Sequence, residues 1–319
     1  MTIKSAAELR RLDEAARAGW LYYVAGNTQD EIARKLGVSR QSAQRMVSLA
    51  ISEGLIKVRL DHPIARCMEL SLLLKGRFGL NSCEIVPSDP DDPFSLTGLG
   101  QAGAAEIERY LKADDSVTIA LGTGRTLVAC VEELSLMECP QHHIVSMTGN
   151  ILLDGSASPY DVVVRMANRV NANHFPMAGP VLSRNAEDKR VLQKQEHVSS
   201  VLNIAREADV TFVGIGDLGT HSPLYVDGFI TSDELNELEE VGAVGEILSW
   251  VYSADGKLVE NSINERVASA PLTVDSDKPV FGMAAGDYKV DAILGALRGK
   301  LINSFITNER TAELVLARD

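Results

Sequence analysis

Three loops in the chain combine glycine with polar side chains in spacings that suit the binding of anions or hydroxyl groups. In the segment ALGTGRTL, Gly122 and Gly124 allow a sharp backbone turn that exposes amide donors at the start of a helix. Arg125 and Thr126 follow directly and add side-chain donors. The segment predicts an anion cradle, although a lone GxG also serves as a tight strand-to-helix turn that binds no ligand.

The other two loops also place polar groups directly after apolar runs. GIGDLGTHSPLY begins at Gly214 and carries Asp217, His221 and Ser222, while MAAGDYKVDAI places Lys289 at the start of an expected helix. Each has a simpler alternative, because Asp217 can cap a turn and Lys289 can be a solvated charge. Three polar loops at one edge of a sheet nevertheless favour a binding pocket more strongly than any one of them alone.

A second kind of chemistry is indicated near the amino terminus, in QDEIARKLGVSRQSAQRMVS, residues 29–48. Long side-chain donors on one face of a helix suit the base edges and phosphates of DNA, and a short Ser42 permits close approach. The residues expected to contact DNA are Thr28, Gln29, Ser39, Arg40, Gln41, Ser42, Gln44 and Arg45.

The spacing of small and apolar residues in this segment predicts a helix-turn-helix that positions those donors. Ala33 is small where the two helices would cross, and Gly37 can adopt the positive φ of a tight turn. Thr28 with Glu31 forms a capping-box pattern, and Ser39 can cap a second helix that begins at Arg40. Amphipathic helix pairs of this kind also occur in proteins that never bind DNA.

The elements around the helix-turn-helix predict a winged head that ends near residue 62. A helix over residues 7–24 would bury one stripe, formed by Leu9, Leu12, Ala16, Trp20 and Tyr23. The segment 52–59 reads as a helix end followed by a short strand, which Pro63 would stop. We therefore predict a winged helix-turn-helix domain over residues 1–62 and an effector-binding and oligomerisation domain over residues 63–319.

From residue 63 onward the pattern predicts an α/β domain with a doubly wound, mostly parallel sheet. A helical stretch follows residue 64 and is ended by Gly79. The expected strands are 83–86, 117–121, 143–147, 210–215, 246–252 and 279–284. The expected helices are 100–111, 126–136, 160–171, 188–207, 232–239 and 291–304.

Charge and composition agree with a small DNA-binding head on a larger body. Residues 1–62 carry ten Lys and Arg against seven Asp and Glu, a net of +3, and the remaining 21 against 37 give −16. Since an acidic body is repelled by phosphates, DNA contact must be confined to the head. The four cysteines form no CxxC pair, and His142 and His143 would point to opposite faces of a strand, so we expect no metal, no cofactor and reduced thiols. The amino terminus lacks an apolar run long enough for a membrane, which predicts a cytoplasmic protein.

Over nearly its whole length the chain resembles the SorC family of bacterial sugar-responsive transcriptional regulators. The head segment LYYVAGNTQDEIARKLGVSRQSAQRMVSLAISEGLIKV is similar to the family's signature. GTGRTL, DVTFVGIGDLG, the stretch 244–257, GMAAGDYK and LRGKLINSFITNERTAELVL resemble its successive blocks in their usual order. This colinearity makes the resemblance specific.

The resemblance implies a body of the sugar-phosphate isomerase and deaminase type that senses instead of catalysing. It matches Gly124, Arg125 and Thr126 to the family's phosphate or sugar loop, Lys289 to its effector lysine, and Glu246 to the acidic residue near the sugar hydroxyls. Gly122 and Thr123 of the same loop are also expected to bind the effector. Asn150 and Asp161 correspond more loosely to pocket positions. Glu246 has the alternative of pairing with a surface lysine.

Three positions depart from the family's pattern. Ala285 replaces a usual glycine, Asn308 stands where an aspartate is common, and Asp161 replaces an amide. An added carboxylate repels phosphate, which leaves a phosphorylated sugar and a neutral polyol both open.

We therefore expect a non-enzymatic regulator that binds a double-stranded DNA operator as a homodimer or homotetramer. Its effector is a sugar, sugar phosphate or polyol, and no membrane is involved. An alternative is a sugar-phosphate isomerase or deaminase with an appended head, in which His221 would serve the reaction; another is a scaffold with a vestigial pocket.

Overall fold

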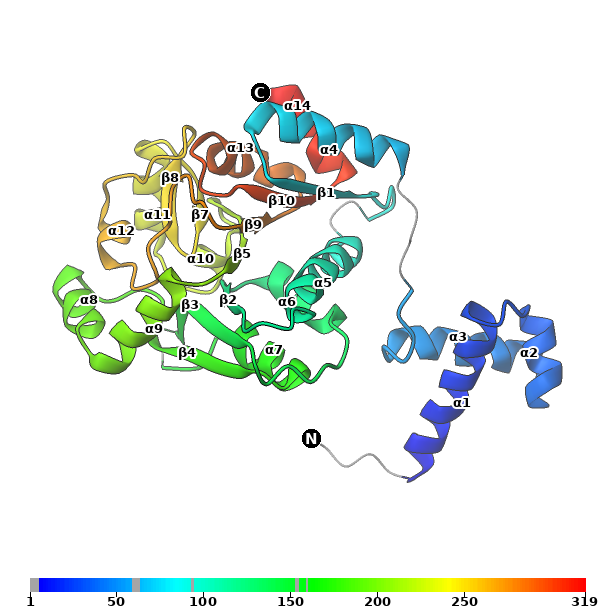
Figure 1. Cartoon of the computed structure of the whole chain (residues 1–319). Helices are drawn as coiled ribbons and strands as arrows, with labels where there is room; N and C mark the ends of the chain where they lie inside the picture. Colours follow the sequence, from blue (N-terminus) through cyan, green and yellow to red (C-terminus); the bar gives the residue numbers. More distant parts are fainter. Residues whose placement is uncertain (1–5, 59–63, 93–94, 153–154, 159) are drawn as a thin grey trace. The chain divides into compact units, whose positions relative to one another are not determined.

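A computed structural model describes residues 6–58, 64–92, 95–152, 155–158 and 160–319 (Figure 1). The chain divides into two compact units, residues 1–62 and residues 63–319. We call the first the head and the second the body. Within the described residues, no helix is both long enough and apolar enough to cross a bilayer.

The head contains three helices, α1 (Ala6–Tyr23), α2 (Gln29–Leu36) and α3 (Arg40–Ser52). The backbone N–H of Glu31 donates to the Thr28 side chain while the Glu31 carboxylate accepts from the Thr28 backbone N–H, which completes the expected capping box. Gly37 ends α2 in the left-handed conformation with φ 66°. The Ser39 hydroxyl accepts from Ser42 N at 3.1 Å at the start of α3. The predicted start of α3 at Arg40 is thus confirmed, together with both caps and the turn.

The predicted apolar stripe of α1 is wrong at three of its five positions, whereas Leu12 is buried as predicted. Leu9 is 53% exposed and Trp20 is 54% exposed, and Tyr23 is also exposed. The buried side of α1 is instead formed by small residues and one leucine, namely Leu12, Ala15, Ala18 and Gly19. The reason is close packing, because a Cβ on Gly19 would lie 2.7 Å from the Ala50 Cβ of α3. Two helices that approach this closely exclude the large side chains that we assigned to the core.

The predicted wing strand is absent from residues 53–58, the described part of the segment. After α3 ends at Ser52 the chain forms a turn in which Gly54 has φ 64°, and Leu55 N and Ile56 N both donate to Ala50 O. Ile56 then packs toward Gly19. Arg59 and Pro63, to which the rest of the wing was assigned, lie outside the described residues.

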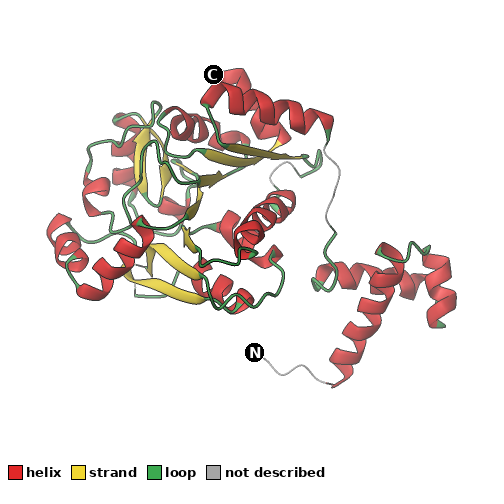
Figure 2. Ribbon diagram, in the orientation of Figure 1, coloured by secondary structure: helices red, strands yellow, loops and turns green. Residues whose placement is uncertain are grey.

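The body is built on a seven-stranded sheet whose pairings are all parallel, which confirms the α/β fold class (Figure 2). The strand order is β1, β10, β9, β5, β2, β3, β4. Between β2 and β5 the order reverses direction in sequence, so the loops after these two strands diverge and leave a crevice at their carboxyl ends. The strands are β1 (Ser82–Val86), β2 (Thr118–Leu121), β3 (His143–Ile151), β4 (Asn173–Pro180), β5 (Val210–Gly214), β9 (Val280–Met283) and β10 (Ser304–Asn308).

Helices cover both faces of this sheet, and successive strand residues feed two separate cores. Ile119 and Leu121 of β2 join one buried cluster, while Ala120 between them joins the other. The first face is covered by α5 (Thr97–Leu111), α6 (Arg125–Glu133) and α7 (Val162–Val170), and the second by α4 (Ala65–Phe78), α9 (Glu196–Arg206), α13 (Val290–Arg298) and α14 (Glu309–Arg318). The remaining helices are α8 (Ala186–Gln193), α10 (Pro223–Val226), α11 (Ser232–Glu240), α12 (Ser262–Arg266) and a short 3-10 helix, Asp287–Lys289.

The strand predicted over residues 246–252 is wrong in form. The segment is a hairpin of β7 (Ala243–Ile247) and β8 (Trp250–Ser253), which forms a separate antiparallel sheet with β6 (Gly216–Asp217). The turn residues Leu248 and Ser249 have φ 57° and 68°. Glycine or asparagine is usual in such a turn. Leu248 and Ser249 are neither, so the apolar run was read as one continuous strand.

Five further elements differ from the prediction. Strands β4 and β10 and helix α14 were missed, and the helix predicted over 188–207 is the pair α8 and α9. β4 contains Pro176 and Pro180, which an edge strand tolerates because one row of its backbone groups is unpaired. The helix predicted over 291–304 ends at Arg298, capped by Gly299, so that β10 begins at Ser304.

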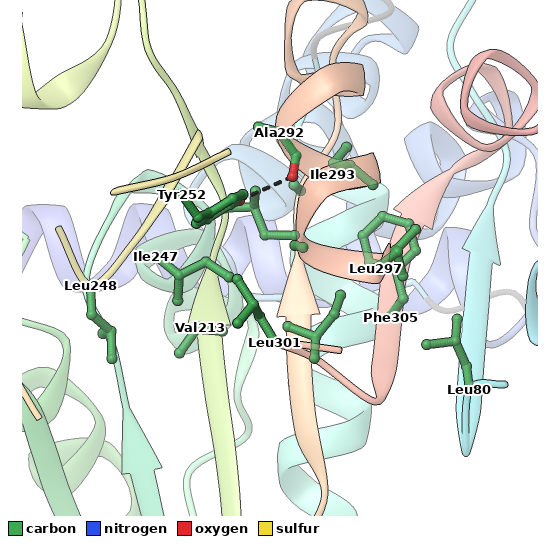
Figure 3. Close-up of a cluster of buried hydrophobic side chains, with 14 of the residues drawn as sticks. Leu80, Val213, Ile247, Leu248, Tyr252, Ala292, Ile293, Leu297, Leu301 and Phe305 are labelled. Atoms are coloured by element: carbon green, nitrogen blue, oxygen red, sulfur yellow. Dashed lines mark hydrogen bonds between the residues drawn. The ribbon is translucent and has the colours of Figure 1, made fainter. Parts of the chain in front are cut away.

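The core of the second face fastens the β7–β8 hairpin to α13. Tyr252 is fully buried, and its hydroxyl donates to Ala292 O at 3.0 Å (Figure 3). Leu248 and Ile247 from the hairpin, Val213 from β5 and Ile293 and Leu297 from α13 belong to the same cluster. The hairpin that carries Glu246 is therefore held against the sheet by a buried hydrogen bond and apolar contacts.

Candidate functional site

The outer face of α3 presents the side chains predicted to contact DNA. Arg40, Gln41, Gln44 and Arg45 are exposed, whereas Ala43 and Val47 on the opposite side belong to the head core. Arg40 Nε lies 3.5 Å from Asp30 Oδ1 of α2, and both side chains are exposed. An exposed pair of this kind contributes little stability, so Arg40 is available to a phosphate.

The remaining predicted contacts lie at the amino ends of the two helices. Thr28 and Ser39 are exposed caps of α2 and α3, and Gln29 and Ser42 are partly exposed just after them. Helix amino termini attract phosphate because their first amides lack an intrahelical acceptor. The structure thus brings all eight predicted residues to the caps, first turns and outer face of the helix-turn-helix.

A pocket of about 230 Å³ lies in the body at the carboxyl ends of β2 and β5. The loop after β2 contributes residues 123–126 and the loop after β5 contributes residues 214–216. Glu246, Leu248 and Ser249 enter from the hairpin, and Ala285, Tyr288 and Lys289 from the loop after β9. The three polar loops singled out in the sequence therefore meet at one pocket. Its other lining residues are Leu96, Ser158, Tyr160, Val181, Pro223, Leu224, Asp227 and Phe229.

One wall of the pocket is the start of α6. Gly124 precedes this helix with φ 117°, a conformation that favours glycine, and no side chain caps the helix. The first amides of α6 are consequently left for a ligand, beside the exposed Arg125 and the buried Thr126. Thr123 Oγ1 donates to Tyr160 O at 2.9 Å, which ties the loop to the segment before α7. The arrangement suits an anion or a ring of hydroxyl groups.

Another part of the lining carries a partly buried acid and a partly buried base. Lys289 Nζ donates to Ile215 O at 2.8 Å, and Glu246 Oε2 accepts from Ser249 N at 2.7 Å. Burial raises the pKa of Glu246 and lowers the pKa of Lys289, while the attraction between their charges opposes both shifts. A Cβ on Gly216 would overlap Glu246 Oε1, so glycine at this position lets the carboxylate lie against the backbone.

Several predicted effector residues lie beside this pocket and do not line it. Gly122, Asn150 and Asp161 line a small separate cavity of about 10 Å³, shared with Thr123. Asn150 Nδ2 donates to Asp161 Oδ2 at 3.4 Å, and Asp161 Oδ1 caps α7 by accepting from Val164 N. Roles for these residues in effector binding stay predictions.

The second polar loop contributes differently from the expectation. Asp217 is partly buried outside the lining, where its charge acts on Lys289 and Glu246, and His221 is exposed. Ser222 is completely buried, and its hydroxyl has no hydrogen-bond partner. Among the residues that the structure describes, no group of three or more His, Cys, Asp or Glu side chains could hold a metal ion.

Sequence reasoning missed five polar residues of the pocket, namely Ser158, Tyr160, Asp227, Ser249 and Tyr288. Tyr288 is adjacent to the predicted Lys289, and that adjacency was a usable signal. Asp227 follows the short helix α10 and has no glycine-rich context of its own before it, so its place in the pocket depends on how the loop after β5 folds back. Burial raises the pKa of Asp227, and the Arg125 charge opposes that rise.

Comparisons with known proteins find a family that matches the body and relatives that match nearly the whole chain. The family described as "Putative sugar-binding domain" matches residues 62–317. The erythritol catabolism regulatory protein EryD of Brucella abortus is 32% identical over 304 residues, which cover 95% of this chain and 96% of that protein. The transcriptional regulator LsrR of Escherichia coli K12 is 28% identical over 309 residues, covering 95% of this chain and 94% of that protein.

A solved structure extends the similarity to the head. The full-length sorbitol operon regulator SorC from Klebsiella pneumoniae is 26% identical, with a TM-score of 0.70. The match covers 96% of this chain and 99% of that one.

Proposed function

Because the chain belongs to the SorC family of transcriptional regulators with a sugar-binding domain, we propose that it regulates transcription in response to a small effector. The head binds a double-stranded DNA operator, and the body binds a sugar, sugar phosphate or polyol. The proposal is carried by one observation: a single chain joins a helix-turn-helix with an exposed basic and amide face to a pocket lined by hydrogen-bonding groups.

The side chains of α3 support recognition in the major groove. Arginine forms bidentate bonds with guanine and glutamine with adenine, so Arg40, Gln41, Gln44 and Arg45 cover both kinds of contact. The second helix of a helix-turn-helix is the one that enters the groove. One head supplies few contacts, so we infer that the protein binds a palindromic operator as a homodimer or homotetramer.

The pocket lining supports a polyhydroxylated effector. The free amides of α6, the Lys289 ammonium and the Glu246 carboxylate provide donors and an acceptor around one space. The relatives' names mention erythritol catabolism and a sorbitol operon, and both compounds are polyols. We infer a cytoplasmic regulator of carbohydrate or polyol metabolism.

Effector binding must differ between two conformations in order to regulate. A ligand shifts DNA affinity only if it binds one conformation more tightly than the other, typically by about 1–3 kcal/mol in coupled systems. Thr123 to Thr126 and the hairpin that carries Glu246 contact the same pocket, so closure of these two segments around an effector is a source of such a difference.

The DNA-binding part of the proposal is tested by replacing Arg40 and Arg45 with alanine. Operator affinity is measured by fluorescence anisotropy at several salt concentrations, with a duplex that the wild-type protein selects from genomic fragments. We expect weaker binding and a salt dependence reduced by about one phosphate contact per arginine. Arg165→Ala combined with Arg190→Ala, which removes the same number of positive charges from exposed sites on the body, is the control. Unchanged affinity in the double variant contradicts the assignment of α3 to the groove.

The alternative, an isomerase or deaminase with a DNA-binding head, predicts turnover. Purified protein incubated with sugar phosphates and amino-sugar phosphates would then release product at a rate proportional to protein concentration. We expect none, because the proposal assigns the pocket to sensing and His221, the candidate reactive histidine, is exposed outside the pocket lining.

A further inference from the structure

The charges that line the body's pocket cancel. Among the described lining residues the charged ones are the cations Arg125 and Lys289 and the carboxylates Asp227 and Glu246. A phosphate ester carries up to two negative charges into such a site, where removal from water is compensated only if the site offers unpaired positive charge. Resting on the regulatory function above, we propose that the effector is a neutral polyol and that Asp227 discriminates against its phosphate ester.

Arg125 is the cation on which phosphate binding at the start of α6 would depend. It is the first residue of that helix, and its guanidinium is close enough to Asp227 to oppose the burial-induced rise in that carboxyl's pKa. Asp227 therefore supplies a negative charge to the same pocket, within electrostatic range of Arg125. A phosphate that approached the α6 amides would be attracted by the Arg125 guanidinium and repelled by the Asp227 carboxylate.

Lys289, the second cation, also already interacts with other groups of the protein. Its Nζ donates to Ile215 O, and the charges of both Asp217 and Glu246 act on it. Asp217 lies outside the lining but adds a third carboxylate to the surroundings, and Asp161 adds a fourth in the small cavity beneath the loop that follows β2. The two cations of the lining are thus balanced by its two carboxylates, and Asp217 and Asp161 add negative charge nearby, so the pocket offers no unpaired positive charge to a dianion.

A neutral polyol suits the same groups better. Each hydroxyl can donate to a carboxylate and accept from an amide or ammonium, so Asp227 and Glu246 can be satisfied without burying new charge. Leu224 and Phe229 lie beside Asp227 in the lining and offer apolar surface to the C–H groups of the carbon chain. A site that hydrogen-bonds hydroxyls in this way rejects ligands that leave its buried polar groups unpaired.

The test compares matched pairs of ligands on three proteins. Calorimetry measures the affinities of erythritol, ribitol and sorbitol and of the monophosphate of each for the wild type, Asp227→Asn and Asp233→Asn. Asp227→Asn keeps the size of the side chain and removes its charge. Asp233 lies exposed on α11 outside the pocket, so Asp233→Asn is the control for loss of one negative charge.

We expect at least one neutral polyol to bind the wild type about tenfold or more tightly than its monophosphate. Asp227→Asn should reduce this ratio by about tenfold, chiefly by improving phosphate binding, whereas Asp233→Asn should keep the wild-type ratio. A wild type that prefers the phosphate, or that binds none of these compounds, overturns the proposal. A ratio that Asp227→Asn leaves unchanged overturns the role of Asp227.

The same samples separate this inference from the function beneath it. A polyol that binds with the expected preference and leaves operator affinity unchanged supports the inference and contradicts the regulatory function. A sugar phosphate that binds more tightly than its neutral polyol and changes operator affinity contradicts the inference and supports the regulatory function.

Discussion

The pocket residues are positioned mainly by backbone groups. Lys289 is oriented by the carbonyl of Ile215, and Glu246 by the amide of Ser249, a residue whose positive φ closes the β7–β8 turn. Charged groups oriented in this way keep fixed directions when the pocket is empty. A fixed arrangement lowers the entropic cost of binding, which is the physical basis of preorganisation.

We predict that Lys289→Ala weakens binding of the effector by about 2 kcal/mol, the usual contribution of a hydrogen bond to a charged group. The measurement is calorimetry with the polyol that binds the wild type most tightly. Lys257→Ala is the matched control, since this lysine is 82% exposed and pairs with Asp255 away from the pocket. Equal effector affinity in Lys289→Ala and the control would remove Lys289 from the site.

A second prediction at the residue scale concerns the buried thiols. Burial raises the pKa of Cys83 and of Cys130 to about 12, and all four cysteines are buried and free. The thiolate is the reactive form, so an aromatic disulfide reagent at pH 8 should label the native protein slowly and the urea-unfolded protein rapidly. Rapid labelling of Cys130 before unfolding would contradict the buried placement.

The raised pKa of Cys130 also makes the free energy of unfolding depend on pH. The folded pKa of Cys130 exceeds its ordinary value of 9.0, so the unfolded state loses this proton first. The contribution to stability is present in full below pH 9 and declines as the pH rises toward about 12. Urea titrations across the alkaline range should therefore show a falling free energy of unfolding.

At the scale of elements, the head shows how much local chemistry predicts. The capping box at Thr28, the turn at Gly37 and the cap at Ser39 were all readable, because each depends on side chains within a few residues of the backbone that it caps. The face of α1 was not readable. Trp20 is the more apolar choice for a core, but the close approach of α1 to α3 admits only Gly19 and Ala18 there.

In the body, too, elements with a clear local signal were predicted, and elements that depend on their tertiary surroundings were not. Five strands with continuous apolar runs were predicted near their observed bounds, whereas β4 lies at the sheet edge and carries prolines, and the β7–β8 turn lacks glycine. At the site, Arg125 and Lys289 come soon after strands, and they were predicted from that position together with the resemblance to the SorC family. Asp227 was missed because its place in the pocket is set by tertiary folding after α10.

We predict that Ser39→Ala destabilises the first turn of α3 by about 1 kcal/mol, because Ser42 N loses its acceptor. Hydrogen exchange followed by mass spectrometry on the full chain should show faster exchange, by about fivefold, in peptides that begin at Arg40. Ser52→Ala removes a hydroxyl from the other end of α3 and should leave that turn unchanged. Identical exchange in both variants would show that the Ser39 cap carries no stability.

At the scale of the whole molecule, the head and the body have net charges of opposite sign. The head has a net charge of +3 and the body −16, so a phosphate backbone attracts one and repels the other. This asymmetry orients the chain on DNA without a sequence-specific contact. In the proposed function, specificity then depends on the few side chains on α3, and regulation depends on the pocket at the switch between β2 and β5.

The most direct test of the account measures operator affinity of the full-length protein with and without a polyol that calorimetry has shown to bind. Fluorescence anisotropy at fixed salt, with the selected duplex, gives both affinities. The account predicts that saturating polyol changes operator affinity by about fivefold or more. A polyol that occupies the pocket and leaves operator affinity unchanged would contradict the claim that the body controls the head.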